Sequence, residues 1–170
     1  MKTAVHIREE TESDIQAISD ITLAAFMNVP VSHPTEPFII HALRAGGALS
    51  LSLVAEMKDR VVGHVAFSPV TISDGTIDWF GLGPVSVLPE VQRRGVGIAL
   101  IKEGLARLRR LGGKGCVLVG DPNYYLRFGF SNIPDLIYEG VPPEVFLALS
   151  FCGTFPTGIV QFHEAFLADS

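Results

Sequence analysis

The spacing of apolar residues predicts helices early in the chain and strands after them. Beyond a short strand expected over residues 5–8, apolar or small positions recur at helical spacing: Ile15, Ile18, Thr22 and Ala25. Ser13, with Gln16 three residues later, is a capping-box pair at the start of this helix. A second helix is expected over residues 37–45, because Gly46-Gly47 is a common helix stop.

Continuous apolar runs beyond residue 48 predict strands joined in hairpins. The runs at 49–57 and 61–70 are separated by the short polar turn 58–60. Asp74-Gly75 is a two-residue turn signal, so residues 77–87 are expected to return alongside 61–70 as the next strand.

The strand predicted at 77–87 contains three residues that weaken sheet pairing, Gly81, Gly83 and Pro84. A proline has no N–H to donate to a neighbouring strand, and a glycine inside a strand often marks a bulge. We therefore expect this strand to give up part of its pairing.

A helix and a further strand follow this point. The segment Gln92-Arg93-Arg94-Gly95-Val96-Gly97 leads into a helix that ends near Leu111, with apolar positions at Ile98, Leu100, Ile101, Leu105 and Leu108. The all-apolar run 116–119 is typical of a strand buried on both faces, which indicates parallel pairing after a helical crossover. Asp121-Pro122 begins a short helix over 123–128, and further strands are expected at 144–151 and 158–166.

Positive charge is concentrated around the glycine turn of an otherwise acidic chain. The 170 residues hold 13 basic and 18 acidic side chains, a net charge of −5, yet the segment 92–114 holds seven basic residues against Glu103 alone. Arg93 and Arg94 precede the glycines at a helix N-terminus, where free N–H groups and the helix dipole favour an anion. The nucleotide-binding pattern GxxxxGK[ST] is absent, and Leu100 replaces the third glycine of GxGxxG.

The length and composition predict a single domain over residues 1–170. Cys116 and Cys152 form no paired framework, which favours a reducing compartment. The N-terminus lacks a signal-peptide layout, and the longest uncharged stretch, 145–163, is broken by glycine and proline. We therefore expect a cytoplasmic protein without membrane association, and no residue grouping has the spacing of metal ligands.

Two motifs in their expected order resemble the GNAT superfamily of acetyl-CoA-dependent N-acetyltransferases. Gln92-Arg93-Arg94-Gly95-Val96-Gly97 matches the Q/R-x-x-G-x-G/A loop, and Tyr125-Leu126-Arg127-Phe128-Gly129-Phe130 is similar to the Y-x-x-x-G-F segment. The stretch that begins at Gly120-Asp121-Pro122 is especially similar to a bacterial branch of small acetyltransferases that are mostly without an assigned substrate. The resemblance covers residues 4–167 in element order and 80–130 at the level of motifs.

The resemblance implies an α/β (α+β) fold and a set of cofactor contacts. The expected fold is a mixed, mostly antiparallel central sheet with a splayed parallel strand pair, flanked by helices. The loop residues that would hold the pyrophosphate of acetyl-CoA are Gln92, Arg93, Arg94, Gly95, Val96 and Gly97. The N–H groups of Val85, Ser86 and Val87 would face the pantetheine arm and the acetyl carbonyl.

An amine that attacks a thioester needs an oxyanion site, a proton for the leaving thiolate and a proton acceptor. The resemblance makes Tyr125 the proton donor, with Tyr124 as the fallback. If Asp74-Gly75 makes a two-residue hairpin, His64 lies opposite Val85 on the same face, which makes it a candidate base. Other bases remain open: a water chain, or one of the residues Glu36, His33 and His41.

The reaction expected from this reading is direct attack of a primary amine on acetyl-CoA through a tetrahedral intermediate, with a small molecule or a peptide as acceptor. Residues 1–91 hold five basic and 11 acidic side chains, which favours a cationic acceptor. A catalytically silent acyl-CoA-binding regulatory module is the alternative. A nucleic-acid partner is disfavoured by the pI of about 5.5, and a homodimer or a longer acyl-CoA remains open.

Overall fold

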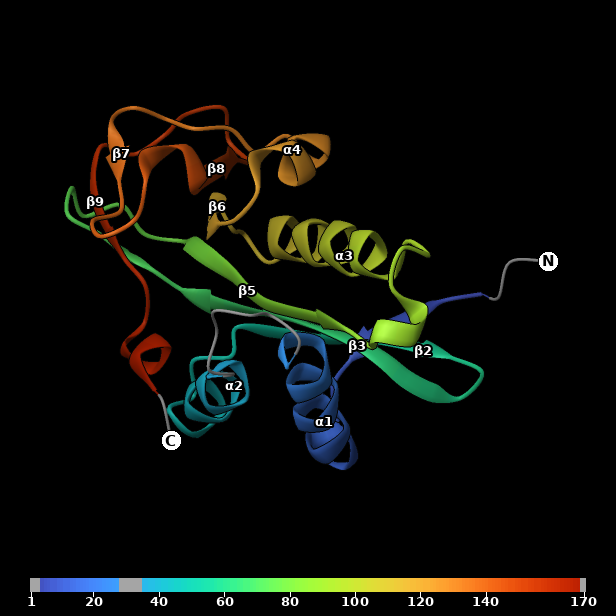
Figure 1. Cartoon of the computed structure of the whole chain (residues 1–170). Helices are drawn as coiled ribbons and strands as arrows, with labels where there is room; N and C mark the ends of the chain where they lie inside the picture. Colours follow the sequence, from blue (N-terminus) through green and yellow to red (C-terminus); the bar gives the residue numbers. More distant parts are fainter. Residues whose placement is uncertain (1–3, 28–34, 169–170) are drawn as a thin grey trace.

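A six-stranded mixed sheet of order β1-β2-β3-β5-β6-β8 crosses the molecule (Figure 1). The computed structural model describes residues 4–27 and 35–168. The strands are β1 (His6–Glu9), β2 (Leu51–Met57), β3 (Arg60–Pro69), β5 (Trp79–Val87), β6 (Gly115–Val119) and β8 (Phe146–Ser150). All neighbours are antiparallel except β5 and β6, which are parallel. The predicted mostly antiparallel sheet with one parallel pair is confirmed.

Helices cover both faces of this sheet. In Figure 1, α1 (Ile15–Phe26) and α2 (Glu36–Ala45) lie below it and α3 (Val96–Arg110) lies above it. Ile18 and Ile40 pack on Val54 of β2 on the lower face. On the upper face, Leu100 and other apolar side chains of α3 belong to the main hydrophobic core. The helices predicted at 37–45 and up to residue 111 are therefore confirmed in position.

The predicted cap of the first helix is wrong. Thr11, not Ser13, occupies the cap, and it opens a short 3-10 turn, η1 (Glu12–Asp14), that continues into α1. The Asp14 carboxylate accepts the Thr11 N–H at 2.7 Å and forms an ion pair with Arg8, also at 2.7 Å. This ion pair fixes Asp14 as the residue that closes the capping box.

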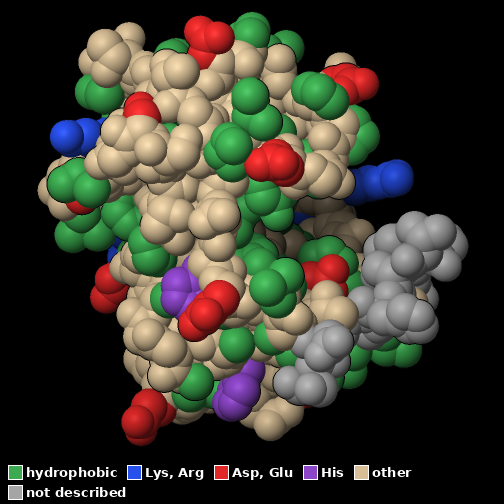
Figure 2. Space-filling view, turned by 90° about the vertical axis from the view of Figure 1, so that its left-hand side faces the viewer, with side chains coloured by type: hydrophobic (Ala, Val, Ile, Leu, Met, Phe, Trp, Pro, Cys, Tyr) green, Lys and Arg blue, Asp and Glu red, His purple; other side chains and the backbone are tan. Residues whose placement is uncertain are grey.

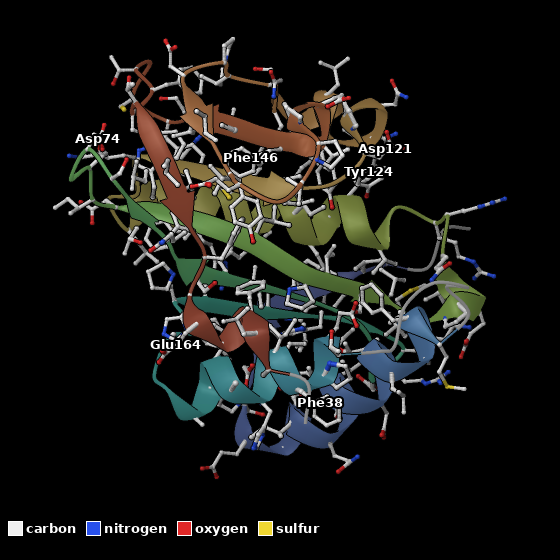
Figure 3. The ribbon with its side chains drawn as sticks, turned by 60° about the vertical axis from the view of Figure 1, so that its left-hand side comes forward. Phe38, Asp74, Asp121, Tyr124, Phe146 and Glu164 are labelled. Atoms are coloured by element: carbon white, nitrogen blue, oxygen red, sulfur yellow. The ribbon has the colours of Figure 1, made fainter. Side chains whose placement is uncertain are left out.

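The predicted two-residue hairpin at Asp74-Gly75 is also wrong. The preceding strand, β4 (Thr71–Ile72), leaves the main sheet and pairs with β9 (Gly158–Gln161), which in turn pairs with β7 (Leu136–Ile137). The Asp74 carboxylate accepts the N–H groups of Thr76 and Thr157, each at 2.9 Å. Contacts with the distant 157–161 segment thus decide this loop, whose tip is marked by Asp74 in Figure 3.

The last third of the chain follows the predicted order with shorter strands. The Asp121 carboxylate accepts the Asn123 N–H and caps α4 (Pro122–Tyr125), which continues as the 3-10 turn η3 (Leu126–Phe128). Strand β8 begins two residues later than expected, after the turn η4 (Pro143–Val145). The strand expected to reach residue 166 ends at Gln161, and η5 (Glu164–Leu167) follows it.

Strand β5 loses its pairing with β6 after three residues, as its glycines and proline predict. The parallel pairs join Trp79–Gly81 with residues 115–117, and none is found beyond Gly81. On its other edge β5 stays paired with β3 up to Val87, across a bulge at which Gly83 and Pro84 stand against one residue of β3. The result is a splay between β5 and β6.

No helix among residues 4–27 and 35–168 is both long and apolar enough to cross a membrane. Within the same residues, no cluster of three or more His, Cys, Asp or Glu side chains is arranged to hold a metal ion. Cys116 is a buried free thiol and Cys152 an exposed one.

Candidate active site

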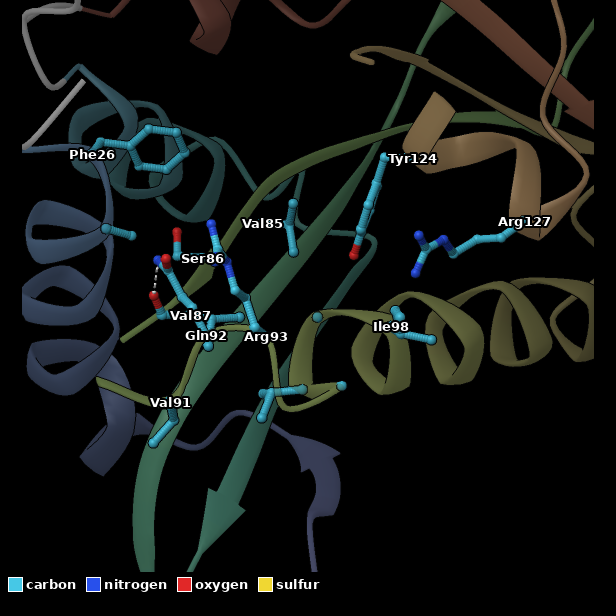
Figure 4. Close-up of a pocket in the computed structure, with 14 residues that line it drawn as sticks. Phe26, Val85, Ser86, Val87, Val91, Gln92, Arg93, Ile98, Tyr124 and Arg127 are labelled. Atoms are coloured by element: carbon cyan, nitrogen blue, oxygen red, sulfur yellow. Dashed lines mark hydrogen bonds between the residues drawn. The ribbon is translucent and has the colours of Figure 1, made fainter. Parts of the chain in front are cut away.

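The glycine turn between β5 and α3 presents free backbone N–H groups. Gly95 has a φ of +85°, a left-handed conformation that glycine adopts without strain. The N–H groups of the first helical residues, Val96, Gly97 and Ile98, have no acceptor within the described part of the chain. The Gln92 side chain donates to the Val87 carbonyl at 3.0 Å and fixes the turn against the end of β5 (Figure 4). Such an arrangement of free N–H groups at a helix N-terminus is suited to binding an anion.

A cavity of about 540 Å³ opens in front of the turn. Its lining comes from the end of α1, the end of β5, the glycine turn and the α4 region (Figure 4). The residues predicted to bind the cofactor that line it are Val85, Ser86, Val87, Gln92, Arg93, Gly95, Val96 and Gly97. Arg94 is not among the lining residues, and neither is Tyr125, which was also predicted to contact the cofactor.

The lining residues that were not predicted as cofactor contacts include Tyr124 and Arg127. The Arg127 guanidinium carbon lies 4.6 Å from the centre of the Tyr124 ring. A Cβ at Gly97 would stand 3.3 Å from the Tyr124 hydroxyl oxygen, so a side chain there would crowd this ring. The signal was present in the sequence, because Arg127 lies inside the Y-x-x-x-G-F segment, but only the fold brings it to the glycine turn.

The end of β5 directs specific N–H groups into the splay. The Leu88 N–H donates to the Val62 carbonyl of β3 at 2.9 Å. Backbone groups alternate in direction along a strand, so Ser86 also faces β3, while Val85 and Val87 face away from it. The Val87 carbonyl accepts from Gln92 on that side, in agreement. Val85 and Val87, but not Ser86, therefore offer N–H groups to a ligand in the splay.

A second cavity of about 400 Å³ adjoins the first and shares Phe26 and Val85 with it. Figure 2 is a space-filling view from the left-hand side of Figure 1. It shows a hollow with hydrophobic side chains gathered around it. Tyr125 and Glu36 line the second cavity. Burial, with a smaller contribution from Tyr124, raises the pKa of Tyr125 to about 12, so its hydroxyl is protonated at neutral pH.

The predicted register of β3 against β5 is wrong at His64. The bulge in β5 shifts the pairing by one residue, so His64 faces Ser86 instead of Val85. Its partner in β2 is Val54, which packs against α1 and α2. Because side chains alternate along a strand, His64 and Val85 point to opposite faces of the sheet.

His64 has the surroundings of a structural residue. Its side chain is fully buried, its Nε2 lies 2.7 Å from the Ser52 hydroxyl, and that hydroxyl also donates to Glu10. Burial lowers the pKa of His64 to about 4, so the ring is neutral at physiological pH. His64 lines neither cavity, and its position gives no support to a role as the base.

The other candidate bases differ in their position relative to the two cavities. His41 is an exposed residue of α2 that lines neither cavity. His33 lies outside the described residues. Of the two described residues, Glu36 lies in a cavity, the one that Tyr125 also lines.

Comparison with known proteins identifies the family to which this chain belongs. The family model described as "Acetyltransferase (GNAT) domain" matches residues 6–133. The chain belongs to the GNAT acetyltransferase family. The family resemblance carried by the two sequence motifs is thereby confirmed.

Two relatives of this GNAT acetyltransferase have been solved with a bound cofactor. A GNAT family acetyltransferase from Brucella melitensis in complex with acetyl-CoA is 48% identical, with a TM-score of 0.86 over 96% of this chain and 99% of that one. The Escherichia coli protein YhbS in complex with CoA is 30% identical, with a TM-score of 0.89 over 99% and 94%.

Curated relatives agree with this assignment. The uncharacterized N-acetyltransferase YhbS of Escherichia coli (strain K12) is 35% identical over 125 residues, which cover 73% of this chain and 72% of that protein. These relatives are named N-acetyltransferases, so this GNAT member is an enzyme of that class, and nothing in the comparisons supports the silent binding module.

Proposed function

We propose that this enzyme binds acetyl-CoA in the larger cavity and transfers the acetyl group to a primary amine that occupies the second cavity. The observation that carries the proposal is the splay at Gly81, because it exposes Val85 where the two cavities adjoin. The relatives solved with acetyl-CoA and CoA support this assignment. Since the two linings extend from Ala25 to Phe166, we propose that the whole chain works as one domain.

The glycine turn and two arginines would hold the pyrophosphate. The free N–H groups of Val96, Gly97 and Ile98 lie at the N-terminus of α3, which is the positive end of its helix dipole. Arg93 and Arg127 add charge from two sides of the same cavity. The acidic net charge of the chain makes this local positive site selective for an anionic cofactor.

The Val85 N–H is the donor we assign to the acetyl carbonyl. It points into the splay, where β6 no longer competes for it. A backbone donor held by the sheet needs no rearrangement as negative charge develops on the carbonyl oxygen. Val87 would serve the pantetheine arm further toward the turn.

Tyr125 is the donor we assign to the leaving sulfur. Its pKa of about 12 exceeds the roughly 8.5 of a free thiol, so full proton transfer to the thiolate is uphill. The hydroxyl therefore acts chiefly by hydrogen bonding to the sulfur. The N–C bond forms first to give the tetrahedral intermediate, and the C–S bond of that intermediate then breaks. Of the two protons that the ammonium loses, one ends on sulfur and one in solvent.

The test is a calorimetric titration with acetyl-CoA, with adenosine diphosphate as a reference ligand, followed by an assay of CoA release with primary amines. We expect micromolar acetyl-CoA binding and amine-dependent CoA release. A folded sample that does not bind acetyl-CoA would overturn the proposal. Binding without CoA release across primary amines would instead restore the silent module.

A further inference from the structure

Glu36 is a charged residue on the buried face of α2. It precedes Ile39, Ile40 and Leu43 by three, four and seven positions, which places all four on one side of the helix. The three apolar residues are 8%, 2% and 0% exposed. Glu36 is itself half-buried in the first turn of α2, where the helix dipole favours an acidic residue. Its place on the apolar face also makes it part of the lining of the second cavity.

The Glu36 carboxylate has no counterion among the described residues of its cavity. Its Oε2 atom is buried and has no hydrogen-bond partner among the described residues. The residues that line the second cavity include no Lys, Arg or His. A carboxylate oxygen withdrawn from water without a partner is unfavourable, and a cation that enters the cavity relieves this cost.

The wall of the same cavity is aromatic. Tyr138 and Phe162 meet edge to face with ring centres 4.9 Å apart, and Phe162 lies 5.3 Å from Phe166. Aromatic faces attract ammonium groups and also pack against apolar groups. The volume of about 400 Å³ lies in the lower part of the range for small-molecule sites.

We propose that Glu36 binds the ammonium group of the acceptor, and that the acceptor is a small primary amine with an apolar, preferably aromatic, substituent. The inference rests on the proposed acetyl transfer and names its substrate class. The ammonium pairs with Glu36 while the substituent packs on the wall of Tyr138, Phe162 and Phe166. Val85 lines the same cavity, which brings the bound amine toward the acetyl group.

Two probes of equal shape test the charge. We would measure binding of 2-phenylethylamine and of 2-phenylethanol by calorimetry, with the protein saturated with desulfo-CoA. The wild type should bind the amine about tenfold or more tightly than the alcohol, as expected for a charge-assisted bond. Glu36→Gln should abolish this preference, and Glu36→Asp should retain part of it.

Glu164→Gln is the matched control, because Glu164 is exposed on η5 and does not line the cavity. It removes the same charge and should leave the preference unchanged. Three results would overturn the inference. They are an unchanged preference in Glu36→Gln, equal affinity of the wild type for the two probes, and no binding of either probe at millimolar concentration.

The outcome is separable from the proposed function. Acetyl-CoA titration of the same variants reports the cofactor site, and Glu36→Gln should bind acetyl-CoA as the wild type does. Normal cofactor binding with an unchanged probe preference would remove Glu36 alone, whereas loss of cofactor binding in the wild type would remove the proposed function. Thermal unfolding of each variant shows whether it folds normally. If Glu36→Gln has a folding defect, the probe preference of Glu36→Asp tests the inference in its place.

Discussion

Tyr124 and Tyr125 meet edge to face with ring centres 4.9 Å apart, yet they line different cavities. Tyr124 lies over the glycine turn beside Arg127, as Figure 4 shows, while Tyr125 reaches the cavity that holds Glu36. Neighbouring residues thus line different cavities, and the roles proposed for them predict that their variants differ.

Tyr125→Phe should lower kcat by about 10²-fold or more, within the usual range for acid–base groups, with little change in the Kd for acetyl-CoA. The reason is that the hydroxyl bonds the sulfur only as it leaves. Steady-state kinetics and calorimetry check both quantities. Tyr124→Phe is the matched control and should leave kcat within about threefold of the wild type. A larger loss in Tyr124→Phe would exchange the two roles.

Gly97→Glu should weaken acetyl-CoA binding by about 100-fold or more, since it adds a carboxylate and bulk at the anion site. A Cβ alone would stand 3.3 Å from the Tyr124 hydroxyl. Lys102→Glu changes the charge of the same helix more strongly at an exposed position outside the cavity. Its Kd should stay within about threefold, because solvent screens the charge. Equal losses in both variants would contradict a local anion site.

Arg127→Gln should weaken acetyl-CoA binding by about tenfold and reduce its dependence on salt, because Arg127 supplies charge inside the cavity. Arg109 offers a matched comparison, since its guanidinium also lies over an aromatic ring, 4.8 Å from the centre of Phe151, but outside the cavity. Titrations of the Arg127→Gln and Arg109→Gln variants with acetyl-CoA at two salt concentrations should distinguish the two arginines. If Arg109→Gln and Arg127→Gln weaken binding equally, the assignment of Arg127 fails.

His64 should affect stability and leave the pH dependence of catalysis unchanged. Its folded pKa of about 4 is below the usual 6.5, so the unfolded chain binds more protons between these values. The free energy of unfolding should therefore fall as the pH decreases from about 6.5 to 4.

The variant His64→Gln tests this role. We expect it to lose about 1–3 kcal/mol of stability through the buried bond to Ser52, with less of the acid dependence. Denaturant unfolding across this pH range measures both effects. Its pH–rate profile near neutrality should keep the shape of the wild type, and a lost inflection there would restore His64 as the base.

Sequence prediction succeeded where the signal is local. The segment from Gln92 to Gly97 predicts a glycine turn before a helix, because a glycine at positive φ and free N–H groups depend on few neighbours. The interruption at Gly81, Gly83 and Pro84 likewise predicts the splay that opens the cavity. The order of the longer helices and strands followed from hydrophobic periodicity, with boundaries off by a few residues, but the two-residue strands β4 and β7 were not predicted.

Prediction failed where distant segments decide the outcome. Asp74-Gly75 has the composition of a tight hairpin, but bonds to Thr157 draw it toward β9. The bulge in β5 then shifts the register by one residue and turns His64 away from the face of Val85. A single-residue shift reverses the face of every later side chain, so no local pattern could assign this histidine.

The sequence by itself determined the family, the order of the main helices and strands, the glycine turn and the place where the sheet opens, because each is encoded by residues close together in the chain. Only the tertiary structure decided which side chains share a cavity. Arg127 joins the glycine turn, and Glu36 joins Tyr125 against an aromatic wall formed by the last third of the chain. These juxtapositions depend on strand pairing and helix packing across the whole sheet, which a linear pattern does not specify.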